Sequence, residues 1–240
     1  MHSLRLHQGR LFELARRRNL PVHQVDLGYI VHCALGELFG ENAPQPFAIT
    51  GDRGSHVRVL GYAAKPKEAL VRDSAGLADP SIQAVSASAT HESKRMPDAW
   101  EAGQRLGFAV RVLPVVRLAR GATIRKAGAE TDAFLAKALI AGPDAKLDRE
   151  EVYRGWFVEQ FSRLGGAQVA DVRLTSFQRV RLIRRTQGNS RASHVTEQPS
   201  ASLAGTFEVT EPNAFQRLLA RGVGRHRAFG FGMLLLRRPR

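Results

Sequence analysis

Tyr29 and His32 are the residues in this sequence whose types and spacing best suit catalysis. They stand three positions apart, so a helix through them would carry both on one face. Histidine titrates near neutrality and can act as general acid or general base, while tyrosine can orient a hydroxyl or a phosphate. Taken alone, a Tyr-x-x-His spacing is more typical of two ordinary surface residues, so the catalytic interpretation depends on its surroundings.

Such a pair could serve several acid–base reactions, and one of them is RNA cleavage without a metal ion. Such a reaction uses the 2′-OH of the scissile nucleotide as nucleophile, a group that accepts its proton and a group that protonates the leaving 5′-oxygen. A cation must stabilise the charge that develops on the phosphorane-like transition state. The products would be a 2′,3′-cyclic phosphate and a 5′-OH. Whether His32 would act as acid or as base stays open.

A helix has to present these two side chains, and the sequence predicts one from Leu27 to about Phe39. Asp26 is a good N-cap and Gly40 follows the last apolar position. The apolar stripe of that helix leaves Tyr29 and His32 outside it. Residues 9–25, before the helix, are interpreted as a basic connector. The other elements expected in the first half are strands at Ser3–Gln8, Phe47–Thr50, His56–Tyr62 and Ile82–Val85 and a helix at Lys65–Asp73.

The second half repeats this order of elements. The elements expected there are strands at Leu106–Arg117, Val169–Ile183, Leu203–Thr210 and Phe229–Leu236 and helices at Glu150–Leu164 and Asn213–Ala220. Two β-α-β-β-α-β units predict an α+β fold of tandem ferredoxin-like (RRM-like) domains, residues 1–100 and 101–240, joined by a polar linker at 86–98. An extra helix at Glu130–Ile140 would be an insertion in the second domain, either a structural prop or an RNA-gripping finger.

The charge of the chain indicates a polyanionic partner. The 240 residues carry a formal net charge of +14 and have a pI near 11.1. Residues 1–100 hold 12 Lys and Arg against 10 Asp and Glu, whereas residues 101–240 hold 24 against 12, and 21 of those 24 are arginine. Because arginine binds phosphate through a bidentate fork, this bias favours a nucleic acid over a merely soluble basic surface.

The arginines gather in segments that suit a phosphate backbone. Alternation along Arg173–Arg185 predicts Arg173, Phe177, Arg179 and Arg181 on one face of a strand, and a turn at 188–191 would make a basic hairpin tip. Near the C-terminus Gly222, Gly224, Gly230 and Gly232 bracket the basic tripeptide Arg225-His226-Arg227. Glycine lets the backbone approach a ligand closely. The predicted RNA-binding residues are Arg125, Lys126, Arg173, Arg179, Arg181, Arg184, Arg185, Arg191, Gly222, Gly224, Arg225, His226, Arg227, Gly230 and Gly232.

Three segments carry a resemblance to a known family. The most specific is Phe207–Gly232: a strand, a turn into a short helix, the turn Gly222-Val223-Gly224 and then Ala228-Phe229-Gly230-Phe231-Gly232. Gly103–Leu106 with Pro114–Arg117 is similar to the entry of the second domain, and Tyr29 to His32 is similar to a first-helix motif. Together they resemble the CRISPR-associated endoribonucleases that cut precursor crRNA within its repeats, above all the Cascade-type (type I-E) branch and secondly the type IV enzymes.

The resemblance implies a function for these residues. His32 and Tyr29 would be catalytic, and the basic strand would grip the stem-loop of the CRISPR repeat RNA, which is cut at its 3′ base. The product crRNA would be retained for the other subunits of a multi-protein effector complex. His226 could contact phosphate or replace His32, and we favour binding because the corresponding position varies in the family. Two alternatives stay open, a non-catalytic RNA-binding subunit of a CRISPR ribonucleoprotein and a basic structural protein of the ribosome or another nucleic-acid assembly.

The cysteine, histidine and apolar content predict the compartment of the protein and whether it binds a metal or a membrane. Cys33 is the only cysteine, which excludes an internal disulfide and fits a reducing cytoplasm. The eight histidines lie far apart in sequence, so we expect no metal and no cofactor. No apolar run approaches the length of a membrane span, so we expect a cytoplasmic protein without membrane contact.

Overall fold

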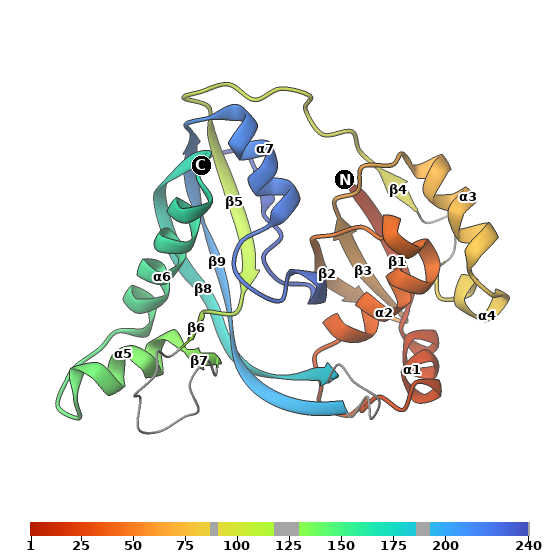
Figure 1. Cartoon of the computed structure of the whole chain (residues 1–240), viewed down its shortest axis with the longest axis horizontal. Helices are drawn as coiled ribbons and strands as arrows, with labels where there is room; N and C mark the ends of the chain where they lie inside the picture. Colours follow the sequence, from red (N-terminus) through yellow and green to blue (C-terminus); the bar gives the residue numbers. More distant parts are fainter. Residues whose placement is uncertain (87–90, 118–129, 186–192, 240) are drawn as a thin grey trace.

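The computed structural model describes residues 1–86, 91–117, 130–185 and 193–239, which form two α+β units side by side (Figure 1). Each unit has a four-stranded antiparallel sheet, ordered β2-β3-β1-β4 in the first and β10-β5-β9-β8 in the second. Numbered within its own unit and read from one edge, each sheet has the order 4-1-3-2. The predicted α+β class is confirmed, and this shared order is the one that a β-α-β-β-α-β chain produces.

The first unit buries its helices against one sheet face through an apolar core that includes Leu4, Leu11, Ile30 and Val59. The predicted helix after Asp26 is confirmed with nearly the expected bounds, but its N-cap is Leu27 and not Asp26. The elements are β1 (His2–His7), α1 (Gln8–Arg17), α2 (Gly28–Phe39), η1 (Gly40–Asn42), β2 (Phe47–Arg53), β3 (His56–Gly61), α3 (Lys67–Leu77), α4 (Pro80–Gln83) and β4 (Glu92–Ser93).

Three expectations for the first unit were wrong. Residues 9–25 contain helix α1, because Leu11, Leu14 and Ala15 make an apolar face that the arginine-rich composition concealed. Ile82–Val85 is not a strand, since Asp79 caps α4 with Pro80 in its first turn. The fourth strand lies instead inside the expected linker, where Glu92 and Ser93 pair with β1.

The second unit has an aromatic core between its sheet and helices α6 and α7, with stacked rings of Phe108, Phe157 and Phe161. Each fully buried ring of this kind stabilises the fold by about 1.5–3 kcal/mol. The elements are β5 (Arg105–Val112), β6 (Val115–Arg117), β7 (Glu130–Asp132), α5 (Ala133–Ala141), α6 (Arg149–Leu164), β8 (Ala167–Arg185), β9 (Ser193–Val209), α7 (Pro212–Arg221), η3 (Arg227–Phe229) and β10 (Leu235–Arg237).

Several strands and helices of the second unit have other bounds than predicted, because of a proline and a capping carboxylate. The strand predicted at Leu106–Arg117 divides into β5 and β6 around Pro114, which has no N–H to donate. The predicted insertion helix begins at Ala133 because Asp132 accepts a hydrogen bond from the Phe134 N–H, and Glu130 belongs to strand β7. The last strand is shorter than expected, since Phe229 ends η3 and β10 begins at Leu235.

The prediction that Arg173, Phe177, Arg179 and Arg181 share one face of β8 was wrong because the strand contains a β-bulge. The pairing of β8 with β9 shifts between Leu174 and Ser176, so Arg173 faces Ala204 while Phe177 and Arg179 face Ala201 and Pro199. One inserted residue exchanges the two faces of a strand. Arg173 therefore lies on the opposite face from Phe177, Arg179 and Arg181, and with Arg237 and Arg238 it lines a cavity of about 570 Å³.

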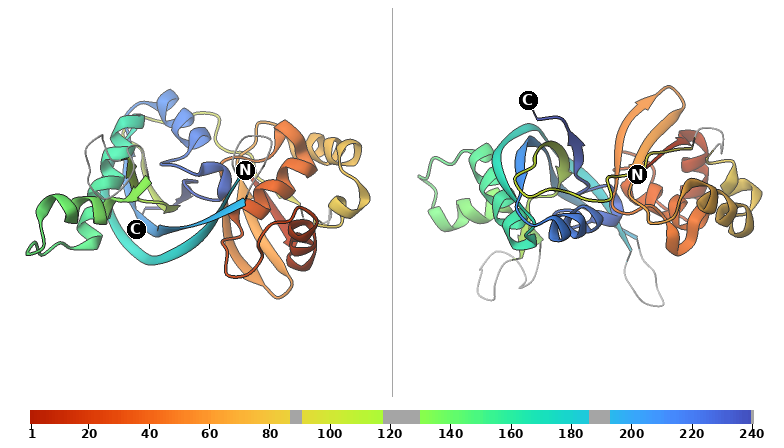
Figure 2. Two further views of the ribbon diagram at one scale, coloured as in Figure 1. Left: turned by 60° about the horizontal axis from the view of Figure 1, so that its bottom comes forward. Right: turned by 90° about the horizontal axis from the view of Figure 1, so that it is seen from above.

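The long hairpin β8–β9 connects the two units. It bends away from the second sheet and reaches α1 and α2 of the first unit (Figure 2). Ile183, near the end of β8, is buried in the core of the first unit. The Asp26 N–H donates to the Arg181 carbonyl at 2.9 Å, just before α2 begins. Among the helices within the described ranges, none is long and apolar enough to cross a membrane.

Candidate active site

Helix α2 presents Tyr29 and His32 on the side that faces the second unit. Ile30, Val31, Ala34, Leu35 and Leu38 are buried in the first core, whereas Tyr29 and His32 are half-buried. The expectation that both lie outside the apolar stripe is confirmed for His32, whereas Tyr29 packs partly against the first core. Their ring centroids are 6.1 Å apart.

The glycine-rich loop of the second unit packs onto these two residues. The ring of Phe229 lies 5.3 Å from the Tyr29 ring and 5.2 Å, edge-on, from the His32 ring, measured between centroids. Gly28 makes the approach possible, because a Cβ at that position would collide with the Phe229 carbonyl oxygen. The structure thus brings together the two segments that the sequence analysis selected from opposite ends of the chain.

The environment of His32 lowers its pKa from the usual 6.5, through burial first and then through the positive charge of Arg18. Burial disfavours the charged imidazolium, and a nearby cation does the same. Both effects favour the neutral imidazole. Arg18 follows the end of α1 and forms an ion pair with Glu37 of α2. Arg18 is thus a cation near His32 that the sequence analysis did not single out, and the Arg16–Arg18 run was its only sequence signal.

The loop after α7 has the positive φ angles that its glycines were expected to permit. Gly222, Gly224, Gly230 and Gly232 all have φ between +73° and +82°. The atoms that crowd them belong to the protein, since added Cβ atoms would lie 3.2 Å from Trp156 at Gly224 and 3.2 Å from Phe47 at Gly230. These glycines fit the loop between the two units, a packing role that the sequence analysis had not assigned to them.

The basic tripeptide of the loop is held by an acidic residue. Glu130 accepts hydrogen bonds from Arg225 Nε at 2.5 Å and from His226 Nε2 at 3.1 Å. The His226 side chain is 7% exposed and the Arg225 side chain 42% exposed. Arg227 donates to the Arg221 carbonyl oxygen. An RNA contact by His226 stays a prediction, and no sequence pattern pointed to Glu130.

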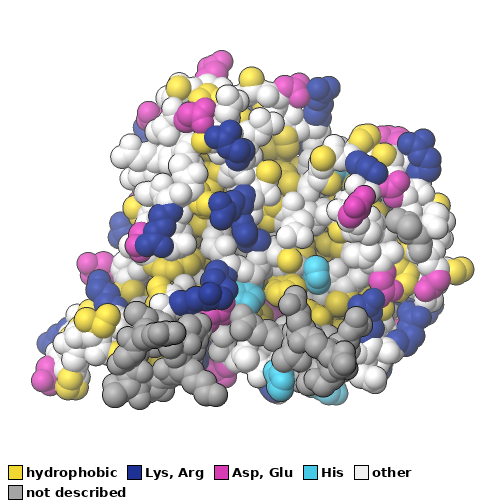
Figure 3. Space-filling view, in the orientation of Figure 1, with side chains coloured by type: hydrophobic (Ala, Val, Ile, Leu, Met, Phe, Trp, Pro, Cys, Tyr) yellow, Lys and Arg dark blue, Asp and Glu magenta, His cyan; other side chains and the backbone are white. Residues whose placement is uncertain are grey.

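Exposed arginines cover the surface that leads to this loop. Arg217 and Arg221 of α7 and Arg225 follow at intervals of four residues and are exposed, a spacing that the sequence analysis overlooked. Figure 3 shows Lys and Arg side chains in a row down this face of the second unit. Arg179 is exposed on β8 and forms an ion pair with Glu197.

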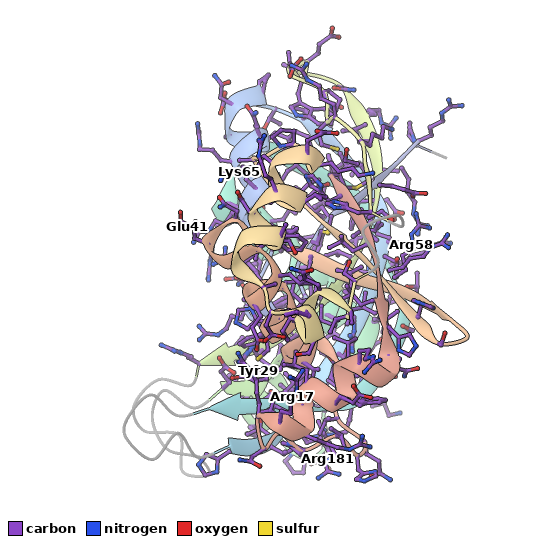
Figure 4. All side chains as sticks on the ribbon, turned by 90° about the vertical axis from the view of Figure 1, so that its right-hand side faces the viewer. Arg17, Tyr29, Glu41, Arg58, Lys65 and Arg181 are labelled. Atoms are coloured by element: carbon purple, nitrogen blue, oxygen red, sulfur yellow. The ribbon has the colours of Figure 1, made fainter. Side chains whose placement is uncertain are left out.

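Figure 4 places Tyr29 and Arg181 toward the same end of the molecule, away from Glu41 and Lys65. Arg181 Nη1 donates to Gln24 Oε1 at 3.5 Å, which joins β8 to the segment before α2. The backbone of Arg184 and Arg185 ends β8. Arg125, Lys126 and Arg191 lie outside the described residues.

The part of the chain that the structure describes contains no cluster of potential metal ligands. Within those residues, no three His, Cys, Asp or Glu side chains gather in a way that could hold an ion. The expectation of a metal-independent reaction stays a prediction, supported by the chemistry of Tyr29 and His32.

Comparison with known proteins identifies the family. A model of the family described as CRISPR associated protein matches residues 10–238. This chain belongs to the CRISPR-associated protein family. A search of curated proteins gave no match.

Solved structures share the fold over nearly the whole chain. The CRISPR endoribonuclease Cse3 bound to a 19-nucleotide RNA is similar with a TM-score of 0.64 and 19% identity, over 99% of this chain and 100% of that one. Cas6e from Escherichia coli str. K-12 is similar with a TM-score of 0.58 and 17% identity, over 99% and 100%. A chain of a CRISPR RNA-guided surveillance complex is similar with a TM-score of 0.53 and 14% identity, over 98% of each chain. At these identities the likeness establishes a Cse3/Cas6e-like fold.

Proposed function

We propose that this CRISPR-associated protein is a metal-independent endoribonuclease that binds the stem-loop of CRISPR repeat RNA and cleaves precursor crRNA at the 3′ base of the stem. Its two units would be tandem ferredoxin-like domains, residues 1–100 and 101–240. The shared 4-1-3-2 strand order supports that division.

The observation that carries the proposal is the contact of Phe229 with both Tyr29 and His32. A half-buried histidine and tyrosine on one helix face, covered by a glycine-rich loop of the other unit, form a site between the two units. Both segments also carry the family resemblance, and the family match spans both of them.

The lowered pKa of His32 favours the role of general base. The neutral imidazole accepts the proton of the 2′-OH as the O2′–P bond forms and the P–O5′ bond breaks. The leaving 5′-oxygen takes a proton from water, and the hydroxide that remains takes the proton of the imidazolium, which restores neutral His32. The products are a 2′,3′-cyclic phosphate and a 5′-OH. Arg18 stabilises the charge that develops on the phosphate, and Tyr29 orients the 2′-OH or the phosphate.

The RNA would lie along the exposed arginines that lead to this site. Their forked guanidinium groups suit the phosphates of a hairpin stem. In the comparison, the Cse3 structure is described as bound to RNA and another similar chain belongs to a surveillance complex, which supports retention of the crRNA for partner subunits. The proposed contacts are the exposed Arg179, Arg181, Arg217, Arg221 and Arg225, with Arg125, Lys126, Arg184, Arg185 and Arg191 kept from the sequence analysis.

Cleavage of repeat RNA by the purified protein tests the proposal. The wild-type protein should cut in EDTA and should fail on RNA with a 2′-deoxy substitution 5′ of the cut. His32→Ala should lower the cleavage rate by roughly 10²–10⁴-fold with little change in hairpin affinity, and Tyr29→Phe should be milder. His56→Ala, which changes an imidazole on β3, is the matched control.

The other outcomes separate the alternatives. A strict Mg²⁺ requirement would contradict the mechanism. An active His32→Ala variant together with an inactive His226→Ala variant would show that His226, and not His32, is the catalytic histidine. Tight hairpin binding without cleavage would make the chain an RNA-binding subunit. Equal affinity for duplex DNA would indicate a general nucleic-acid-binding protein.

A further inference from the structure

The carboxylate of Glu130, on strand β7, contacts Arg225 and His226 of the loop that covers the site. It is 5% exposed and accepts from Arg225 Nε at 2.5 Å and from His226 Nε2 at 3.1 Å. Since a carboxylate only accepts, the hydrogen of each contact belongs to the cationic or imidazole partner. A nearly buried carboxylate with two such donors is a fixed structural element rather than a solvated surface charge.

His226 needs such a partner because its backbone is strained. Its φ of 58° and ψ of 30° lie in the left-handed region, which residues other than glycine seldom adopt. This conformation makes His226 the N-cap of η3, and the Phe229 N–H donates to the His226 carbonyl at 2.8 Å. The position of the Phe229 ring on His32 therefore depends on the conformation of His226.

Glu130 is itself held rigidly by the insertion in the second unit. It pairs with Arg117 in the two-stranded β6–β7 sheet. Two residues later, Asp132 caps α5 and accepts hydrogen bonds from Arg149 and the Tyr153 hydroxyl of α6. The insertion thus presents Glu130 from a braced strand, which gives residues 130–141 a role that the sequence analysis left open.

We propose that Glu130 and His226 are positioning residues. They hold the glycine-rich loop so that Phe229 packs on His32 and fixes the position of the catalytic imidazole. The proposal rests on the proposed function, in which His32 is the general base. It assigns His226 to the support of the site rather than to a phosphate contact. The effect of Glu130 reaches His32 through His226, η3 and Phe229.

The first experiment needs no RNA and no activity. NMR of the full-length free protein, with the His32 signals assigned from their loss in His32→Ala, reports the ring contact of Phe229. Glu130→Ala and Glu130→Gln should both shift the His32 ring signals. Glu159→Gln, which breaks an exposed pair with Arg163 on α6, should leave them in place. Unchanged His32 signals in both Glu130 variants would overturn the proposal.

Single-turnover cleavage then separates positioning from RNA binding. Glu130→Ala should lower the cleavage rate by about 10²-fold, the cost of a misplacement near 1 Å, without weakening hairpin affinity, since an acidic residue has been removed. A loss of affinity with an unchanged rate would contradict the proposal. If the wild-type protein does not cleave, the NMR comparison still decides the positioning, so the two failures are distinguishable.

A second variant guards against loss of folding. Asparagine adopts the left-handed conformation readily but is too short to replace the imidazole, so His226→Asn keeps the backbone and removes the contact with Glu130. The Glu130→Ala/His226→Asn pair should be non-additive in rate, with the double variant no slower than the slower single one. Additive effects would mean that the two residues act independently and would overturn the pairing.

Discussion

Asp26 and Arg111 join the two units at the start of helix α2. Asp26 Oδ2 accepts a 2.6 Å hydrogen bond from an Arg111 guanidinium nitrogen, and Asp26 Oδ1 accepts from the Gly28 N–H at 2.9 Å. The Arg111 guanidinium lies over the Phe231 ring at 4.5 Å and its Nε donates to Ser200 Oγ. One carboxylate thus ties the first turn of α2 to β5 of the other unit.

Removal of Arg111 should destabilise the protein because it leaves the Asp26 carboxylate, 8% exposed, without its cation. Breaking a buried ion pair on one side costs about 3–5 kcal/mol of the free energy of unfolding. Arg111→Ala should lose an amount of this order in denaturant titration. Arg163→Ala, from an exposed pair on α6, should lose less than about 1 kcal/mol. Equal small losses in both variants would show that the Asp26 contact is not a strong one.

Gly28 and Gly36 offer a matched pair of substitutions within α2. A Cβ at Gly28 would collide with the Phe229 carbonyl, whereas one at Gly36 would meet no atom within 4 Å. Gly36→Ala should raise the free energy of unfolding by about 0.5–1 kcal/mol through helix propensity. Gly28→Ala should lower it by about 1–3 kcal/mol and slow cleavage, since the loop must shift. Thermal melting and single-turnover cleavage measure both, and wild-type cleavage in Gly28→Ala would contradict the importance of the Phe229 contact.

The pH dependence of cleavage should report the base form of His32. Its pKa is lowered from 6.5 by burial and by Arg18, so the neutral form persists above a midpoint that lies below 6.5. kcat/KM, which reports the free enzyme, should rise with pH through this midpoint and then level off. Arg18→Gln should move the midpoint upward, because the imidazolium then loses a repelling charge. A rate that falls through the same midpoint as the pH rises would make His32 the general acid.

The arginines of the proposed RNA surface should contribute through phosphate contacts. Arg179→Gln and Arg221→Gln should each lower the log–log slope of hairpin affinity against salt by about one. Arg72→Gln, on α3 of the first unit, should leave the slope unchanged. Filter binding at several salt concentrations measures the slopes. Unchanged slopes for Arg179 and Arg221 would place the RNA on another face of the molecule.

Local sequence determined much of the fold and half of the candidate site. The apolar stripe of α2 and the spacing of Tyr29 and His32 act within a few residues, so the helix and its half-buried pair followed from the sequence. The predicted N-cap was wrong by one residue, since Leu27 is the N-cap and Asp26 accepts from the Gly28 N–H. The glycines near the C-terminus also indicated a loop with positive φ, and the structure confirms it. Composition alone misled at α1, where three buried positions outweigh the arginines around them.

Tertiary structure decided which distant groups meet. Phe229 packs on His32, Glu130 on His226 and Arg111 on Asp26 only because the two units and the insertion fold against one another. The face that Arg173 occupies depended on a single bulge, which no alternation pattern reveals. Helix and strand preferences arise from neighbours in the chain, whereas the pKa of His32 and the conformation of His226 depend on groups that the chain brings close only when it is folded.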